Sequence, residues 1–519
     1  MPLPLNQDAF ILGTLVVCFV YWVNGQRQRR QLPPGPKKLP FIGNLLSMPS
    51  RVEWETFARW GQEYNSDIIH VNALGTSIVI LNSYNVASDL LDKRSGTYSD
   101  RPHFTMLHEL SGWGFLFSLL PYGDVWRESR RLFTKHFNSS HHISINQKRD
   151  IIYVRRLLGQ LLQRPNDFLQ HARTLVGSTT LSMTYSINVQ PYNDPYIAIA
   201  EDAVETAGDL LIAGAFLVDI IPILKYVPDW FPGAKFQRKA AIMRAHAAKI
   251  RDATFEATKK LMASGDYNPS FVTEALTQLE YSEHPGRDLD ILKDVAAQTY
   301  MAGADTTASA LGTFFLAMVC YPQVQKKAQE ELDKVLNGKL PEANDIRSLP
   351  YLSALIKEVY RNNPTFLPHQ GVPHQTIGDD LYNDYHIPAK SVVIANQWAM
   401  LNDERDYPLP REFRPERFLK NGSLDKSVRD PMDIAFGFGR RVCAGKHLAH
   451  STITLAAASV LSTFDLLRKL DENHLEIEPR REYKPSAICQ PIDFPCVIKP
   501  RSRHAAELIR SSSGLDLDE

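Results

Sequence analysis

The sequence is poor in cysteine and has no excess of charge of either sign. Its five cysteines among 519 residues are odd in number and lack the paired spacings of zinc sites, which excludes a disulfide scaffold and a zinc module. Lysine plus arginine total 58, and aspartate plus glutamate also total 58, so no global field attracts nucleic acid or an acidic partner. Charge-driven docking must therefore come from a local patch.

Linkers and internal repeats are also missing. No Gly/Ser-rich or Pro-rich linker interrupts the chain between about residues 50 and 500, and no fixed-period repeat is evident. We therefore predict one large catalytic domain over residues 49–500. The remaining tail, residues 501–519, ends in SSSGLDLDE and is predicted to be disordered.

Charge is absent from one stretch near the N-terminus. From Ala9 to Gln26 no residue is charged, and the run AFILGTLVVCFVYWV would span about 27 Å as a helix, enough for a thin, endoplasmic-reticulum-like bilayer. A cleaved signal peptide is the main alternative, but no small-x-small cleavage site follows and Asp8 precedes the run. We expect residues 1–26 to be a single-pass anchor in the endoplasmic reticulum membrane.

The segment after this run is basic and rich in proline. Arginines and lysines between residues 27 and 38 favour a cytosolic position for everything that follows the anchor. The stretch LPPGPKKLPFIGN then fixes extended backbone, because proline cannot continue the anchor helix. Residues 27–48 are therefore predicted to be a stiff hinge between the membrane and a cytosolic catalytic domain.

Hydrophobic periodicity predicts a mainly α-helical fold with small β-sheets. A hairpin is expected at 67–82, where Gly75 separates two β-rich runs, and another strand region at 387–398. Long helices are expected at about 286–319, 322–337, 349–362 and 443–465. The first of these is too long and apolar for a surface helix, so it should cross the middle of the domain. The apolar segment 210–236 is too broken by proline to be a second membrane span.

The segment FGFGRRVCAGKHLAH, residues 436–450, carries the strongest chemical signal. Gly437, Gly439 and Gly445 let backbone pass close to a flat ligand, and Cys443 lies where a helix is expected to begin. Backbone N–H groups and the helix dipole there should favour the thiolate, as a metal–sulfur bond requires. A dinucleotide fingerprint would need glycine at Val442, and a phosphate loop would need a different glycine spacing.

These residues resemble the signature FxxGxRxCxG of the cytochrome P450 family. Phe436, Gly439, Arg441, Cys443 and Gly445 match it in order. The resemblance, which extends from the proline-rich hinge to about residue 500, implies haem b with Cys443 as the axial thiolate ligand. It also implies that the phenylalanine packs near the sulfur and that the arginine meets a haem propionate.

Three further elements resemble haem-supporting parts of that family. WRESR places Trp126 and Arg130 one helical turn apart, and the resemblance assigns both to a haem propionate. Arg101 in YSDRP and His374 in GVPH resemble two further propionate contacts, although an exposed arginine is ordinarily just solvated.

A charged pair and a PERF-like segment resemble the structural network of the same family. In EVYR, Glu358 and Arg361 stand at i, i+3 spacing, and the resemblance joins them to Arg417 of the PERF segment. Such pairs are commonplace on helix surfaces. The resemblance gives this one a structural role around the cysteine loop, and the RNNP that follows Glu358 departs from relatives with an aromatic residue there.

The segment AGADTT in the long central helix resembles the oxygen-activating part of the family. Small residues at Ala302 and Gly303 leave space for dioxygen, and a mid-helix threonine can bond back to the carbonyl four residues earlier. The resemblance assigns Thr306 to holding activated dioxygen with its water, and Asp305 to relaying protons. Without the cysteine motif, the same segment would indicate a helix-packing stripe.

We therefore expect a haem-thiolate monooxygenase that inserts one atom of O2 into a small lipophilic substrate. YSDRP, LSGWGF and PYGDVWRESRR resemble fungal microsomal members of secondary metabolism. No flavin or nicotinamide motif is present, so an NADPH-cytochrome reductase must supply electrons. A local basic patch is available for it, formed by Arg127, Arg131, Arg440 and Lys446.

Two alternatives stay open at this point. A haem-thiolate isomerase or dehydratase would need no outside electrons, and a membrane-bound haem or sterol binding protein would need no chemistry. Asp305 and Thr306 have no purpose in the binding protein and argue against the isomerase. Among the histidines, His141 and His142 are adjacent but lack the spacing of a metal pair on a helix, so a polar loop is expected there.

Overall fold

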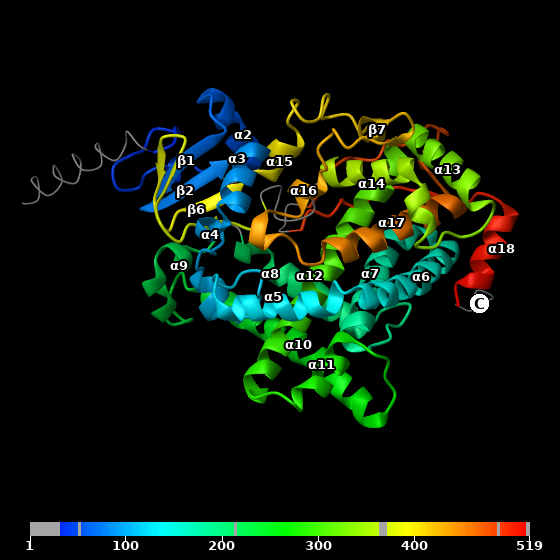
Figure 1. Cartoon of the computed structure of the whole chain (residues 1–519), viewed down its shortest axis with the longest axis horizontal. Helices are drawn as coiled ribbons and strands as arrows, with labels where there is room; N and C mark the ends of the chain where they lie inside the picture. The colour runs from blue at the N-terminus through cyan, green and yellow to red at the C-terminus, as the bar shows by residue number, and fades with distance from the viewer. Residues whose placement is uncertain (1–31, 50–52, 212–214, 363–370, 485–487, 515–519) are drawn as a thin grey trace, which may run out of the picture.

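The computed structural model describes residues 32–49, 53–211, 215–362, 371–484 and 488–514. The expected membrane anchor, residues 1–26, and the last five residues lie outside this part of the chain. Helices dominate the described residues, and the strands β1, β2 and β6 of the largest sheet lie at one side (Figure 1), so the predicted mainly α-helical fold is confirmed. The longer helices are α2 (Glu53–Glu63), α5 (Asp124–Phe137), α6 (Ser140–Gln163), α7 (Phe168–Tyr185), α8 (Pro195–Ala207), α10 (Lys235–Ser264), α11 (Phe271–Leu279), α12 (Pro285–Cys320), α13 (Pro322–Leu336), α14 (Pro350–Asn362), α17 (Lys446–Thr463) and α18 (Arg503–Ser512).

The largest sheet has four strands in the order β1-β2-β6-β3. Strands β1 (Ile68–Ala73) and β2 (Thr76–Leu81) are antiparallel and join through Leu74 and Gly75, both with positive φ, so the predicted hairpin is confirmed. β6 (Val392–Ala395) pairs parallel with β2 and antiparallel with β3 (His374–Gln375). Three two-stranded sheets are formed by β4 (Asp380–Tyr382) with β5 (Tyr385–Ile387), β7 (Leu419–Lys420) with β8 (Ser423–Leu424), and β9 (Phe464–Leu467) with β10 (Val497–Pro500).

Helix α12 runs through the middle of the domain, as the sequence predicts (Figure 1). Its C-terminal half packs Phe314 and Phe315 into one hydrophobic core, and its N-terminal half packs Val295 and Tyr300 into another. Among the described helices it alone is long and apolar enough to cross a membrane, but 89% of that window is buried in protein. Its apolar character therefore reflects core packing. Pro322 starts α13 in its first turn, where the missing N–H costs no bond.

Two predicted segments differ in the structure. The helix expected at 443–465 begins three residues later, at Lys446, because Cys443 lies in the loop before it, and it ends at Thr463, where β9 begins. The tail expected to be disordered forms α18 over residues 503–512, so that prediction is wrong for this part. The Ser502 hydroxyl caps α18 at the amide of Ala505, and the buried Ala505 and Ile509 lie on one helix face.

Candidate active site

The loop around Cys443 is set by a 3-10 turn, Gly439–Arg441, just before the cysteine. The amide of Cys443 donates a hydrogen bond to the carbonyl of Phe436 at 2.8 Å, which closes the loop. Gly439 has a φ of 54°, and a Cβ atom there would lie 2.0 Å from the carbonyl oxygen of Leu91. Gly439 is therefore required by contact with another backbone segment and not, as its place in the motif predicts, by the approach of a ligand.

Gly437 and Gly445 do line the cavity above the cysteine. Gly437 has a φ of 78°, which favours glycine. At Gly445, a Cβ atom would meet no protein atom within 4 Å. The protein itself therefore does not need glycine at Gly445, and the free space there suits a ligand that lies flat against the loop.

The electrostatics of Cys443 differ from the expectation. Burial raises the pKa of the Cys443 thiol, and the amides of Gly445 and Lys446 and the Arg130 guanidinium oppose this rise without cancelling it. The Cys443 side chain has exposed surface, because it faces the cavity, but protein surrounds it. The N–H groups act in the predicted direction, yet the loop alone does not favour the thiolate. A metal cation at the sulfur is needed, since the thiolate is the ligand form.

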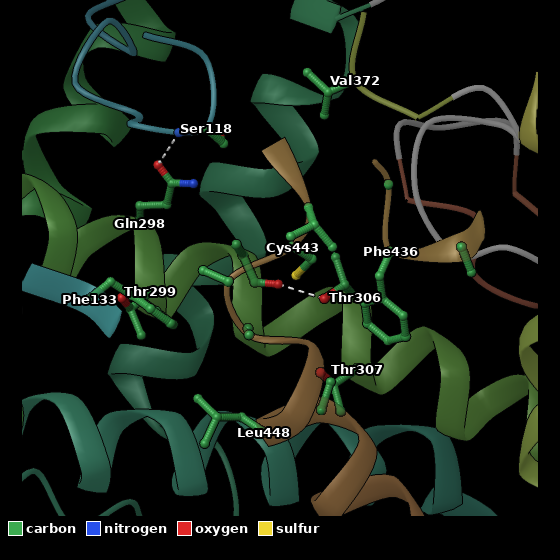
Figure 2. Close-up of a pocket in the computed structure, with 18 of the residues that line it drawn as sticks. Ser118, Phe133, Gln298, Thr299, Thr306, Thr307, Val372, Phe436, Cys443 and Leu448 are labelled. Carbon is green, nitrogen blue, oxygen red and sulfur yellow. Dashed lines mark hydrogen bonds between the residues drawn. The ribbon is translucent and has the colours of Figure 1, made fainter. Parts of the chain in front are cut away.

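The opposite wall of the cavity is the middle of α12. Ala302, Gly303, Thr306 and Thr307 all line it. The Thr306 hydroxyl donates to the carbonyl of Ala302 at 2.6 Å, the bond expected for a mid-helix threonine (Figure 2). In Figure 2, the Cys443 sulfur from the loop and the Thr306 side chain from α12 lie in the same cavity.

A cavity of about 300 Å³ separates these two walls. Its sides away from the loop are mainly apolar, with Phe117, Phe133, Val176, Met183 and Val372 among the lining residues. The residues that the sequence assigns to the cofactor also line it, with the exception of Gly439. They are Arg101, Trp126, Arg130, Ala302, His374, Phe436, Arg441, Cys443 and Gly445.

Basic groups gather on one side of the cavity with no carboxylate among their hydrogen-bond partners. Arg101, Arg130 and Arg441 donate to backbone carbonyls, and no described carboxylate oxygen lies within salt-bridge distance of these guanidinium groups. His374 bonds through Nδ1 to the carbonyl of Tyr98 at 2.8 Å. The accepting carbonyls belong to Ser118, Val372 and Pro373 for Arg101, to Val442 for Arg130, and to Ser99 and Leu120 for Arg441.

This cluster fits the two propionates of haem. Burial lowers the pKa of Arg441 to about 10, and the charge of Asp100 offsets only part of this fall. Burial and the neighbouring charge of Arg101 lower the pKa of His374 well below its usual value. Nη1 of Arg441 is buried and has no hydrogen-bond partner among the described residues. Arg441 also lies over the Trp126 ring, 4.5 Å from its centroid. Anionic groups here would satisfy the free donor and neutralise the cluster.

Asp305 does not line the cavity, although its neighbour Thr306 does. Burial raises the pKa of Asp305 to about 6. Its Oδ1 accepts a hydrogen bond from Nε2 of Gln490 at 3.2 Å, and its Oδ2 is buried without a partner in the part of the chain that the structure describes. Gln490 in turn accepts from the half-buried Arg173. Asp305 is therefore connected through Gln490 to Arg173, on the side of α12 away from the cavity.

The residues expected to form a structural network lie together beneath the cysteine loop. Arg361 donates two bonds to the Glu358 carboxylate, at 2.8 and 2.9 Å, and Nε of Arg417 lies 3.1 and 3.2 Å from the same oxygens. The amide of Arg414 also donates to Glu358 at 2.8 Å. Glu358 and Arg361 are fully buried, so this pair is not one of the exposed pairs that the spacing alone would indicate.

Gln298 and Asp150 are two of the polar cavity residues that sequence reasoning missed. Gln298 lies eight residues before Thr306 on α12, on the same helix face, and its Oε1 accepts from the amide of Ser118 at 3.0 Å (Figure 2). Asp150 of α6 is buried against the hydroxyls of Ser451 and Thr452. The helical periodicity of α12 could have indicated Gln298, but nothing in the sequence joins Asp150 to α17.

Comparisons with known proteins agree with this geometry. The family model described as cytochrome P450 matches residues 33–486. The chain is 63% identical over 493 residues to a cytochrome P450 monooxygenase of Rhodocybe pseudopiperita, which covers 95% of this chain and 94% of the relative. It is 40% identical to a tryptamine 4-monooxygenase of Psilocybe cyanescens, with 95% and 97% covered, and 38% identical to a cytochrome P450 monooxygenase of Postia placenta, with 98% and 97% covered.

Proposed function

This chain belongs to the cytochrome P450 family, and we propose that it inserts one oxygen atom from O2 into a small lipophilic metabolite. The chain is a monooxygenase with haem and an axial cysteine thiolate, as the family and its relatives establish. In the proposed reaction, substrate, O2, NADPH and a proton give hydroxylated substrate, water and NADP⁺. A separate flavin reductase passes on the two electrons. The relatives named above are fungal, which supports a fungal secondary metabolite as substrate.

One observation carries this proposal: a mainly apolar cavity joins Cys443 to the Ala302–Thr307 segment of α12. Cys443 would hold the haem iron, and Arg101, Arg130, Arg441, Trp126 and His374 would hold its propionates. Thiolate-ligated haem supplies reductive O2 activation when bound. The apolar walls hold a lipophilic substrate and exclude bulk water.

Thr306 and Asp305 divide the proton handling in this proposal. The Thr306 hydroxyl donates to the Ala302 carbonyl, so its oxygen can accept a bond from a water in the cavity and hold that water in place. Asp305 has a pKa of about 6, close to neutrality, and can therefore both take up and release a proton. Its bond to Gln490, and the bond from Arg173 to Gln490, connect it to the side of α12 away from the cavity.

The test measures NADPH consumption, product and hydrogen peroxide with a reductase and a substrate from a lipophilic metabolite panel. Thr306→Ala should retain haem and consume NADPH, but form less product and more peroxide. Asp305→Asn should slow total NADPH consumption, by about tenfold or more, because proton delivery is impaired. A product formed without NADPH would identify an isomerase or dehydratase, and NADPH-independent binding without turnover would identify a binding protein.

Gln298 supports a finer proposal about the substrate. The Ser118 amide donates a hydrogen bond to Oε1 of Gln298, whereas Nε2 of Gln298 makes no hydrogen bond to the described residues, so this donor is left facing a mainly apolar cavity. We propose that the substrate carries a hydroxyl or carbonyl oxygen that accepts this bond and fixes the position of oxidation.

Replacing Gln298 by leucine tests this anchor. Gln298→Leu should weaken binding of such a substrate by about tenfold, as expected for one buried hydrogen bond, and should change the ratio of oxidation positions. A substrate analogue without that oxygen should bind wild type and variant equally. Equal loss for both compounds would show that leucine only disturbs packing.

Membrane attachment is proposed from two regions. The uncharged residues 9–26 suit an anchor, and large apolar side chains are exposed on α9 (Leu217–Ile220) and in the segment that joins it to α10. They include Leu217, Ile223, Tyr226, Trp230 and Phe231, of which Trp230 is 77% exposed.

Deleting residues 1–26 should release much of the protein from microsomes, with residual attachment that Trp230→Ser and Phe231→Ser remove. A truncated protein that resists carbonate wash would contradict a single anchor.

The basic patch proposed for the reductase is partly neutralised within the chain. Arg127 pairs with Asp124 at 2.6 Å, and Lys446 pairs with Asp433 at 3.2 Å. Arg440 donates to the Tyr122 hydroxyl at 2.6 Å and keeps its charge. Arg440→Glu should therefore lower the rate of electron transfer more than Arg127→Glu, and both effects should shrink at high salt.

A further inference from the structure

A second group of ligating side chains lies outside the cavity, where three helix ends meet. His136 is near the end of α5, His142 is in the first turn of α6, and Glu274 is in the first turn of α11. Their ligand atoms all lie within 4.8 Å of one another, and all three side chains are half-buried. His142 thus lies on a helix and not in the polar loop expected from the sequence.

The distances suit a small divalent cation. Nε2 of His142 lies 3.0 Å from Oε2 of Glu274, and Nδ1 of His136 lies 3.4 Å from the same oxygen. A tetrahedral zinc ion with bonds of about 2.0–2.1 Å needs its ligand atoms about 3.3 Å apart. Both separations lie near this value, and the two imidazole nitrogens lie within 4.8 Å of each other, so small side-chain movements would admit an ion.

Neighbouring groups already orient two of the ligands. The Ser139 hydroxyl lies 2.6 Å from Nδ1 of His142, which directs Nε2 toward Glu274. The His136 ring packs against Phe137 and Phe271, with centroids 4.8 and 5.2 Å away. Such outer contacts orient ligands in metal sites and fix which nitrogen faces the ion.

We propose that His136, His142 and Glu274 bind one Zn²⁺ ion, with water as a fourth ligand. Two imidazole nitrogens and one carboxylate oxygen are a donor set that zinc accepts readily. The ion would join the ends of α5, α6 and α11. Since α5 also carries Trp126 and Arg130, the ion would stiffen the helix that supports the haem-propionate side of the cavity.

The positive charge of Arg149 should weaken cation binding at this site. Its removal should therefore have the opposite effect from removal of a ligand. Nη1 of Arg149 donates to Oδ1 of Asn146 at 3.1 Å, and the Arg149 charge acts on both His136 and Glu274. Neutral imidazoles, one carboxylate and Zn²⁺ carry a net charge of +1, which a nearby guanidinium repels. Removing this charge should strengthen zinc binding, whereas removing a ligand should weaken it.

The experiment uses the full-length haem protein in detergent, treated with a chelator and then dialysed against ZnCl2 at a series of concentrations. Bound zinc is counted by elemental analysis. Wild type should bind one Zn²⁺ per chain at this site. His142→Ala and Glu274→Gln should bind it at least tenfold more weakly, and His141→Ala, the exposed neighbour, should bind it as wild type does. Arg149→Gln should bind it more tightly.

Thermal unfolding provides the second readout. Zinc should raise the unfolding temperature of wild type and of His141→Ala, but not that of His142→Ala or Glu274→Gln. The haem absorption spectrum of each variant shows that it has folded. The proposal is overturned if wild type binds no zinc, if His142→Ala and Glu274→Gln bind it as wild type does, or if His141→Ala loses it equally. In those cases the His142–Glu274 contact is an ordinary hydrogen bond.

Discussion

Two groups of buried charges lie near the cysteine loop, and they are balanced in different ways. Beneath the loop, Glu358 accepts bonds from Arg361, Arg417 and the amide of Arg414. Beside the cavity, the hydrogen bonds of Arg101 and Arg441 within the described residues all go to backbone carbonyls. A buried charge that the chain pairs itself can serve structure alone, whereas buried like charges without a partner indicate a missing ligand of opposite sign. The comparison therefore separates the structural network from the cofactor site.

The largest effect is expected from removing the carboxylate at the centre of the balanced group. Glu358→Ala would leave Arg361 and Arg417 buried without their partner, which costs about 3–5 kcal/mol of unfolding free energy. Little folded haem protein should accumulate. Glu358→Gln keeps the shape of the side chain and one acceptor oxygen, so it should lower the unfolding free energy less than Glu358→Ala does. Thermal unfolding and haem content are measured for both variants. A Glu358→Ala protein as stable as wild type would show that this network does not stabilise the fold.

A different effect is expected in the unbalanced group. Arg441→Met removes a charge that repels Arg101, so it should destabilise the haem-free chain less than Glu358→Ala does. It should still weaken haem retention by about ten- to hundredfold, because a charge-assisted hydrogen bond contributes about 1.5–3 kcal/mol. Haem transfer to an acceptor protein measures this. Unchanged haem retention would show that Arg441 does not meet a propionate.

Asp150 is a buried acidic residue, and it extends the comparison from basic to acidic groups. Burial raises its pKa to about 7, because only the hydroxyls of Ser451 and Thr452 bond to it. The folded state therefore holds this proton more tightly than the unfolded state, whose aspartate has its ordinary pKa of about 3.9. The stabilisation is complete below pH 4 and is lost as the pH rises toward 7.

Asp150→Asn should accordingly raise the unfolding temperature at pH 8, with a gain on the order of 2–4 kcal/mol, and should raise it much less at pH 4. Asp124→Asn, at an exposed position on α5, is the matched control and should show no such pH dependence. An equal effect of Asp150→Asn at both pH values would mean that the folded state does not raise the pKa of this carboxyl.

Local patterns predicted the elements that depend on local chemistry. Alternating residues around Gly75 gave the β1–β2 hairpin, and the apolar run of α12 gave the central helix. The start of α17 was misplaced because the Cys443 loop is held by its own turn and by the bond to Phe436. The composition of the tail predicted disorder, but a helix that is amphipathic and capped by Ser502 forms there.

At the site, the motif residues were found but the causes of their positions were not. Gly439 is required by the Leu91 carbonyl, a contact between distant segments that no local pattern reveals. The net rise in the Cys443 pKa depends on how deeply the loop is buried. The Gln298–Ser118 bond and the His136–Glu274 contact also join separate elements. Such contacts follow from tertiary packing.

The most direct test is the absorption spectrum of the reduced carbon-monoxide complex. Wild type should show the red-shifted band that reports an axial thiolate, and Cys443→Ser should lose it, because serine does not supply a thiolate. Cys320→Ser, at a buried cysteine remote from the cavity, should keep the band. Haem content is measured in each protein. An unchanged red-shifted band in Cys443→Ser would contradict Cys443 as the ligand and, with it, the assignment of this cavity as the active site.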